Sequence, residues 1–438
     1  MLPKPFHHLP EDFLHVIWRE QYFNQEHLLT RTGEQVRILH PGIHNLNQGP
    51  DFLNAQIEID GMQWQGQVEI HWRSEEWYQH SHHTDPHYNP TILHVVYQGG
   101  KKPIFREDHT NVLEMELKGR IDPELVKRYQ ALKLAQTRIP CEGFWPDLQI
   151  SWYHDWWEEL GQERLRAKAS AMRARLAEVQ YDWEQVLWEA LLKMMGGPVN
   201  KAVFGDLAAR LPYRIVRKAG KDAQTLEALI FGAGGWLGAA EIPEGYPAAL
   251  QATWQHWQHK FQLNGKAPLP LRFSRMRPPQ FPTFRLSQTA QIVAAWQPLS
   301  KLLNPAYWAS WLIQEIPTSA YWHAHSRFGE SRAGKPMCLG RKQREVMLYN
   351  VYLPLALAYL GVHGADQREE EIWQWLSKLP AEDNRITRKY AGLGAGPEHS
   401  GHSQGLIHLY KAYCQEKKCL HCRLGLHVLP GTGGRETG

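Results

Sequence analysis

The stretch GPDFLNAQIEIDGMQWQGQVEIH, residues 49–71, decides the fold of the first part of the chain. Asp60-Gly61 is a dipeptide typical of a two-residue hairpin turn, and it separates two strand-like runs at 55–59 and 66–72. Glu69 and His71 lie two residues apart on the second run, so their side chains share one face of the strand. Asp51 follows Gly-Pro and opens the first strand. We therefore expect Asp51, Glu69 and His71 to lie close together.

Working outward from the hairpin, the front of the chain alternates between one helix and several strands. The apolar spacing predicts a helix over 11–23, and further strands are expected at 36–39, 91–97 and 111–117. The run TILHVVY at 91–97 is almost continuously apolar, which is typical of a strand buried on both faces. Residues 1–120 are thus expected to form an α/β domain.

After Asp122-Pro123 the pattern becomes helical. A helix is predicted over 182–195, where Asp182 is a suitable N-cap and Gly196-Gly197-Pro198 ends the pattern. Residues 121–430 are expected to form a larger, mostly helical region of one or two subdomains, followed by a disordered tail at 431–438. Most of the 19 Trp residues lie in this region, and we expect them to pack between helices.

Composition excludes several classes of protein. With 43% hydrophobic and 21% charged residues among 438, the chain is globular rather than collagenous or disordered. No apolar run long enough for a bilayer is expected, the first residues do not resemble a signal peptide, and five Cys fit a reducing cytoplasm. Phosphate-binding, dinucleotide-binding and serine-hydrolase motifs are absent, so we expect no nucleotide cofactor.

Charge is divided unevenly along the chain. Residues 1–118 carry 9 Lys and Arg against 16 Asp and Glu, while residues 119–438 carry 40 against 29. Thirteen of the 24 His residues lie within the first 110. This division favours metal or acid–base chemistry in front and a polyanion such as DNA or RNA behind, although two solvated surfaces would give the same totals.

The carboxylates of the hairpin suggest a metal centre. Asp51 and Glu69 on neighbouring strands are suited to a hard divalent cation, Mg²⁺ or Mn²⁺, and His71 would orient or deprotonate the attacking water. At these residues the chain resembles the PD-(D/E)XK nuclease superfamily, whose core order is α-β-β-β-α-β. The resemblance implies that Asp51 and Glu69 are metal ligands, that Ile70 offers its carbonyl, and that His71 replaces the usual Lys.

Over most of its length the chain also resembles a bacterial family that carries a domain of unknown function. The resemblance depends on the residues at 38–57, 68–97 and 275–290 and on KKCLHC at 417–422. It supports the boundaries given above and implies no activity.

The loop after the Glu69 strand is rich in histidine. His80, His82, His83 and Asp85 fall within six residues, and we expect them to supply further metal ligands or a general acid. The Asp-Pro and Asn-Pro dipeptides of this loop fit a solvated turn equally well.

Two further motifs lie in the rear of the chain. Arg272, Arg275, Arg277 and Arg285 alternate with Phe side chains, as in a nucleic-acid contact or a connector between helices. Cys414, Cys419 and Cys422, with His427 as a fourth ligand, form an acceptable structural zinc set, the alternative being buried Cys at the end of a helix.

Three functions follow from these patterns. The first is metal-dependent phosphodiester hydrolysis of DNA or RNA, which would make the protein an enzyme. The second is a nuclease-like module that binds nucleic acid without cutting it. The third is a His-rich, metal-binding scaffold protein. The sequence does not distinguish DNA from RNA and does not give the oligomeric state.

Overall fold

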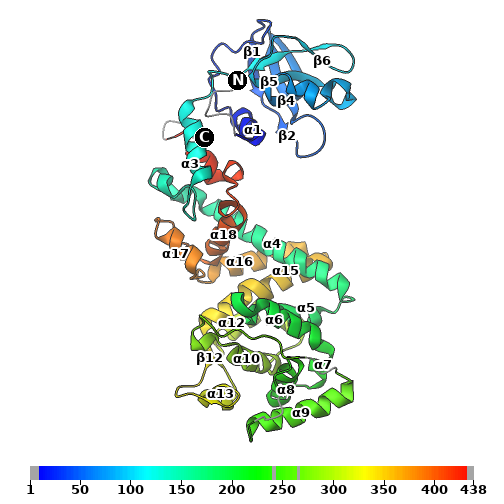
Figure 1. The fold of residues 1–438 in the computed structure, drawn as a ribbon, viewed down its shortest axis with the longest axis vertical. Coiled ribbons are helices and arrows are strands. Elements are labelled where there is room, and N and C mark those ends of the chain that lie inside the picture. The colour runs from blue at the N-terminus through cyan, green and yellow to red at the C-terminus, as the bar shows by residue number, and fades with distance from the viewer. Residues whose placement is uncertain (1–8, 239–242, 264–266, 432–438) are drawn as a thin grey trace. The chain divides into compact units, whose positions relative to one another are not determined.

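The computed structural model describes residues 9–238, 243–263 and 267–431, and the chain divides into two compact units (Figure 1). The first unit contains residues 1–149 and 410–438, and the second contains 150–409. The chain therefore divides near residue 150 rather than at 120, and its C-terminal segment belongs to the first unit. The tail predicted at 431–438 lies outside the described residues except for Gly431.

The first unit is built on a mixed sheet in the order β1-β3-β4-β5-β8, with β2 paired to β3. Its strands are β1 (Val36–His40), β2 (Ile43–His44), β3 (Phe52–Ile59), β4 (Met62–Arg73), β5 (Thr91–Gln98) and β8 (Glu114–Glu116). A small separate sheet pairs β6 (Ile104–Phe105) with β7 (Asn111–Val112). The strands predicted from the sequence are all present, although the one expected at 111–117 is split between β7 and β8.

The hairpin forms as its sequence predicts. Asp60 and Gly61 have φ values of 47° and 80°, which a two-residue hairpin turn of this kind requires. β3 and β4 pair antiparallel, with Phe52 opposite Val68, whereas β4 pairs parallel to β5 and β5 parallel to β8. The strand β5 is buried along almost its whole length. Helix α1 (Glu11–Arg19) packs against β4.

A parallel strand pair needs a crossover connection. Between β4 and β5 this connection contains only the four-residue helix α2 (Glu76–Gln79) and two 3-10 turns, η2 (His82–Thr84) and η3 (Pro86–Tyr88). The sheet, helix α1 and this short crossover make the first part of the chain an α/β region. The predicted order, an N-terminal α/β region followed by a mostly helical region, is confirmed.

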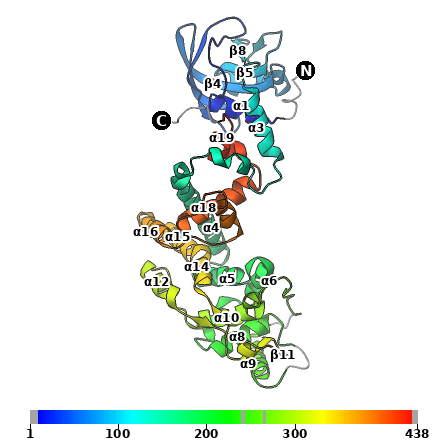
Figure 2. The ribbon, with the colours of Figure 1, turned by 90° about the vertical axis from the view of Figure 1, so that its left-hand side faces the viewer.

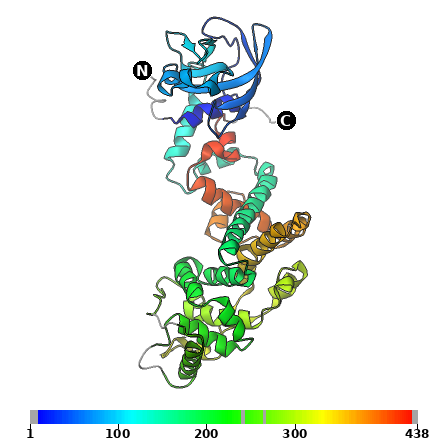
Figure 3. The same ribbon diagram turned by 90° about the vertical axis from the view of Figure 1, so that its right-hand side faces the viewer.

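The end of the chain completes the first unit. Helix α19 (Arg423–Val428) and the 3-10 turn η10 (Cys419–His421) lie near α1 and α3 (Pro123–Leu134), as Figures 2 and 3 show. The Arg128 guanidinium donates a hydrogen bond to the Val428 carbonyl at 3.2 Å, and the Tyr22 hydroxyl donates to the Leu426 carbonyl at the same distance. Residues 300 and 404 positions apart thus hold one unit together.

The second unit is helical, and most of its Trp side chains pack in or against its core as expected, whereas Trp152 is exposed. Its longer helices are α4 (His154–Glu178), α5 (Trp183–Met195), α6 (Gly197–Arg210), α8 (Ala223–Ala233), α9 (Tyr246–Phe261), α10 (Pro282–Ala294), α12 (Pro305–Ile313), α15 (Leu353–Val362), α16 (Glu369–Lys378) and α18 (Ser400–His408). Its shorter helices are α7 (Tyr213–Lys218), α11 (Leu299–Leu302), α13 (Tyr321–Ala324), α14 (Arg341–Met347) and α17 (Arg385–Ala391). Two two-stranded pieces, β9 (Ile316–Pro317) with β12 (Cys338–Leu339) and β10 (His325–Arg327) with β11 (Glu330–Ser331), complete it.

Glycines set the closest helix contact of the second unit, between α4 and α18. A Cβ on Gly405 would lie 1.9 Å from the Trp157 carbonyl oxygen, and one on Gly161 would lie 2.6 Å from that of Gly401. Only glycine permits these backbones to approach so closely.

Among the described residues, one continuous helical stretch, Arg341–Val362, is long and apolar enough to cross a membrane by length and composition alone. Of its most apolar window, 67% is buried inside the fold, and the core helix of a soluble protein passes the same test.

Candidate functional site

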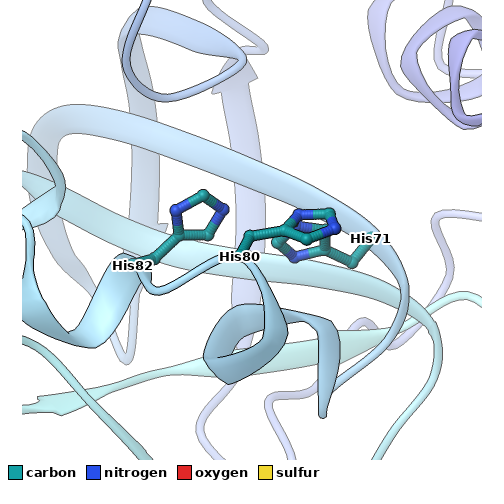
Figure 4. A group of neighbouring side chains, drawn as sticks. All are labelled: His71, His80 and His82. Atoms are coloured by element: carbon teal, nitrogen blue, oxygen red, sulfur yellow. The ribbon is translucent and has the colours of Figure 1, made fainter.

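Three histidines meet at the end of β4, where the crossover connection returns over the sheet (Figure 4). His71 lies on β4, His80 follows α2 and His82 begins η2, and one ring nitrogen of each lies within 4.8 Å of the others. His71 Nε2 is 3.0 Å from His80 Nδ1. Two imidazole nitrogens bound to one ion at about 2.1 Å each would stand about 3.0–3.4 Å apart. The group is thus close to the geometry of a metal site.

Glu69 adds a carboxylate to this group. Its Oε1 lies 3.0 Å from His82 Nε2 and 3.5 Å from His71 Nε2, and its Oε2 accepts a hydrogen bond from the Asp51 backbone N–H. Burial, and then the nearby charge of Asp51, raise the pKa of Glu69 far above its ordinary value. His82 Nε2 is itself buried and, among the described residues, takes part in no hydrogen bond despite its distance from Glu69. A cation here would be paired with the carboxylate and would accept this nitrogen as a ligand.

A series of buried hydrogen bonds orients His71. Glu69, His94 and Glu114 are register partners on β4, β5 and β8. Glu114 Oε2 lies 3.2 Å from His94 Nδ1, and His94 Nε2 lies 2.8 Å from His71 Nδ1. A carboxylate only accepts, so His94 Nδ1 donates to it and His94 Nε2 accepts from His71 Nδ1.

These hydrogen bonds place the proton of the His71 ring on Nδ1. The lone pair is therefore on Nε2, which faces His80 and Glu69. Burial, followed by the neighbouring histidines, lowers the pKa of His71 strongly, so that the ring is neutral, as a metal ligand must be. Hydrogen bonds from His94 and Ser74 lower the pKa of Glu114 against the opposing effect of its burial, so its carboxylate is ionised. Carboxylate partners behind ligating histidines are typical of metal centres.

Replacing Glu114 by glutamine should therefore weaken metal binding without removing a ligand. We expect a loss of affinity of about tenfold to a hundredfold, because the charge that fixes the His94 and His71 tautomers is lost. Titration of Zn²⁺ and Mn²⁺ against a chromophoric chelator measures it. Glu116→Gln, an exposed position on the same strand, is the matched control. Equal affinities in both variants would contradict the role given to Glu114.

The crossover is held in place by one glutamate. Glu76 Oε2 accepts hydrogen bonds from the backbone N–H groups of Trp72 and Arg73, at 2.9 and 3.1 Å. These bonds fix the start of α2 to the end of β4, so that His80, one residue beyond the helix, returns to His71. His80 is exposed, whereas His71 and His82 are buried, so the group opens to solvent at His80.

Asp51 lies beside the histidine group with partners of its own. Its Oδ2 accepts a hydrogen bond from the Ile70 N–H at 2.9 Å and lies 3.3 Å from His15 Nε2 on α1. Glu11, His15 and Asp51 also bring ligand atoms within 4.8 Å of one another. Burial lowers the pKa of His15, but the Asp51 carboxylate more than offsets it, so the net shift is upward. The three residues predicted from the hairpin are thus neighbours, as expected.

The remaining residues of the histidine loop face elsewhere. The His83 ring lies 4.9 Å from that of Tyr78. Asp85 caps η3, accepting a hydrogen bond from the His87 N–H at 3.0 Å. Sequence reasoning also missed His94 and Glu114. The available signal was a single His inside the apolar run at 91–97, a residue that needs a polar partner when buried.

The arginine motif divides into exposed and buried parts. Arg272, Arg275 and Arg277 are exposed. Arg285, by contrast, is buried in α10, where its guanidinium donates to Gln288 Oε1 at 3.1 Å and burial lowers its pKa to about 10. A side chain in this position does not reach a nucleic-acid backbone, so Arg285 is removed from the predicted contact.

Further metal-capable residues and a further cavity occur among the described residues. In the second unit, His154, Glu398 and His402 lie within ligand distance of one another, with Glu158 and His399 adjacent. A cavity of about 450 Å³ lies beside Ile121 and Pro430 in the first unit, and no such group lines it. The candidate site is the group of Glu69 and the three histidines, because three imidazoles and a carboxylate meet there.

The chain belongs to the family described as protein of unknown function (DUF2851), whose model matches residues 11–385. The match covers the candidate site and nearly all of the second unit. No curated protein matches the chain, and no solved structure matches it.

Proposed function

We propose that the protein is a metal-dependent hydrolase that cuts phosphodiester bonds in nucleic acid, with its active centre at Glu69, His71, His80 and His82. The observation that supports this most is the convergence of three imidazoles and a carboxylate at one solvent-open point of the sheet. Four protein ligands of this kind leave two positions in a six-coordinate ion, one for water and one for a phosphate oxygen.

The donor set favours a transition metal. Imidazole nitrogens suit Zn²⁺ and other borderline ions, whereas carboxylate sites suit Mg²⁺ and Mn²⁺. We therefore propose Zn²⁺ rather than Mg²⁺ or Mn²⁺. When bound, such an ion supplies an activated water and a Lewis acid for the phosphate.

The residues of the chain would divide the remaining work. His71, fixed by His94 and Glu114, holds its Nε2 toward the ion. His15 has a raised pKa and lies beside Asp51, so it would offer the positive charge that a neutral His71 cannot offer to a phosphate. Asp51 would hold that imidazolium and face the entering water.

We also propose that the first unit is a divergent PD-(D/E)XK fold. The order of α1, β1, β3, β4, crossover and β5 supports it, as does the parallel pairing of β4 with β5. The short crossover helix and His71 in place of Lys are the departures.

Nucleic acid is the proposed substrate because of the charge of the second part of the chain. Residues 119–438 carry an excess of basic groups. Within the second unit, Arg272, Arg275 and Arg277 are exposed and are proposed to contact phosphates.

The test is a cleavage assay with the full chain, stripped of metal and supplied with Mg²⁺, Mn²⁺ or Zn²⁺, on single- and double-stranded DNA and RNA. His80→Ala should reduce cleavage by at least about a hundredfold, because it removes a ligand. His83→Ala, in the same loop but turned toward Tyr78, should leave cleavage unchanged.

One further variant separates the two possible sites. His71→Lys should abolish cleavage if His71 is a metal ligand, and preserve it if Asp51 and Glu69 alone hold the metal, as in the superfamily. Salt-dependent binding without cleavage in any metal would instead support a non-catalytic binding module. Metal binding with neither cleavage nor nucleic-acid binding would support a scaffold protein.

A further inference from the structure

Four of the five cysteines of the chain meet in the first unit. Cys141, Cys414, Cys419 and Cys422 line one small cavity and are all buried. The fifth, Cys338, is exposed on β12 in the second unit. Cys141 is more than 270 positions from the other three in sequence, and only the return of the C-terminal segment to the first unit brings it to them.

The size of the cavity limits what it can hold. Its volume is about 10 Å³, room for one water-sized sphere and for no organic ligand. Besides the four cysteines, it is lined by Pro140, Tyr413, Lys418 and Gly425. A single ion fits this space, and the four cysteines that line it would supply its sulfur ligands.

The backbone around Cys419 and Cys422 is shaped to expose sulfur to such an ion. The turn η10 begins at Cys419, and Cys422 precedes α19. The backbone N–H groups of Gly425 and Leu424 form hydrogen bonds to the Cys422 sulfur. A Cβ on Gly425 would lie 2.1 Å from the Cys419 carbonyl oxygen, so only glycine lets the chain wrap this tightly.

We propose that Cys141, Cys414, Cys419 and Cys422 bind one structural Zn²⁺ ion as four thiolates. Tetrahedral coordination by four sulfurs is the closed arrangement of structural zinc sites, with Zn–S bonds of about 2.3 Å. The zinc set suggested by the sequence is thereby corrected at its fourth ligand, because His427 is exposed and does not line the cavity.

Zinc would join the two ends of the first unit. Without a metal, burial raises the pKa of Cys141 well above its ordinary value and that of Cys422 to about 12, so both remain protonated thiols. A zinc ion displaces these protons, and its binding energy then becomes folding energy of the first unit.

The proposal is independent of the hydrolase site, and cobalt distinguishes the two. The full chain loaded with Co²⁺ should show the intense thiolate-to-cobalt charge-transfer bands of a tetrahedral thiolate site, which a site of histidines and glutamate does not give. These bands should persist in a His80→Ala, His82→Ala double variant. They should disappear in Cys141→Ser and remain in the matched control Cys338→Ser.

Cys141→His covers the case in which Cys141→Ser does not fold. Histidine keeps a fourth ligand, so this variant should retain one zinc per chain, with weaker charge-transfer bands that reflect three thiolates. The proposal is overturned if the wild-type protein gives no thiolate bands with cobalt, or if Cys141→His gives the same bands as the wild type. Iron in place of zinc in the purified protein would also overturn it.

Discussion

Glu69→Gln is expected to lower metal-dependent cleavage by more than about a hundredfold while leaving nucleic-acid binding nearly unchanged. Glu69 is the only carboxylate among the described residues that contacts both His71 and His82. An amide keeps the shape of the side chain but removes the charge that pairs with the cation, and loss of a direct ligand should exceed the effect of losing an outer partner. Under the proposed function, nucleic-acid binding would rest instead on exposed basic groups of the second part of the chain.

The measurement combines a cleavage rate with a binding isotherm at several salt concentrations. Glu58→Gln is the matched control, a half-buried glutamate on the neighbouring strand β3. Wild-type cleavage by Glu69→Gln would exclude the proposed centre. A parallel loss of binding and cleavage would show that the variant damages the fold, and circular dichroism of the two variants would identify that case.

The second large effect concerns stability. Glu227→Gln should stabilise the protein relative to wild type above pH 7 and have little such effect near pH 4.5. Glu227 is completely buried in α8, where Ser287 Oγ donates to it at 2.9 Å and Ser319 Oγ at 3.2 Å, and Trp322 Nε1 also donates. Burial raises its pKa from 4.5 to about 7 despite these bonds.

The sign follows from the direction of this shift. A raised pKa means that the folded state binds the proton more tightly than the unfolded state, so the stabilisation is complete below pH 4.5 and is lost as the pH rises through 7. The loss is on the order of 3 kcal/mol, since one pKa unit corresponds to about 1.4 kcal/mol. A glutamine amide mimics the protonated acid and does not titrate.

Urea unfolding of both proteins at pH 5 and pH 8 tests the prediction. The difference in unfolding free energy between variant and wild type should grow with pH by this amount. Glu370→Gln, an exposed glutamate of the same unit, controls for the change in net charge. A difference that does not vary with pH would show that Glu227 is ionised throughout.

Local patterns predicted much of the first unit. Asp60-Gly61 specified the hairpin, because few residues accept positive φ at two successive positions, and the apolar run at 91–97 specified a strand buried on both faces. The closeness of Asp51, Glu69 and His71 followed from that register. These features are determined within about fifty residues of sequence.

The rest depended on contacts that spacing does not encode. His94 and Glu114 reach His71 only because β5 and β8 lie in a particular parallel register beside β4. Cys141 has no local motif around it, and only the tertiary fold brings it to the other cysteines. Arg285 lies in α10, where every residue from Pro282 to Ala290 is buried, and its burial reflects the packing of that helix rather than its own charge.

The discontinuity of the first unit has a consequence for biosynthesis. Residues 1–149 leave the ribosome before the second unit does, whereas the segment from 410 onward, which contains η10 and α19, leaves it after the second unit. The second unit, formed from one continuous segment, can complete its core while the nascent N-terminal region still lacks its closing partner. During this interval the apolar side chains of the N-terminal region that will later pack against α19 have no partner. Premature termination shortly after residue 409 would therefore impair the beginning of the protein more than its middle.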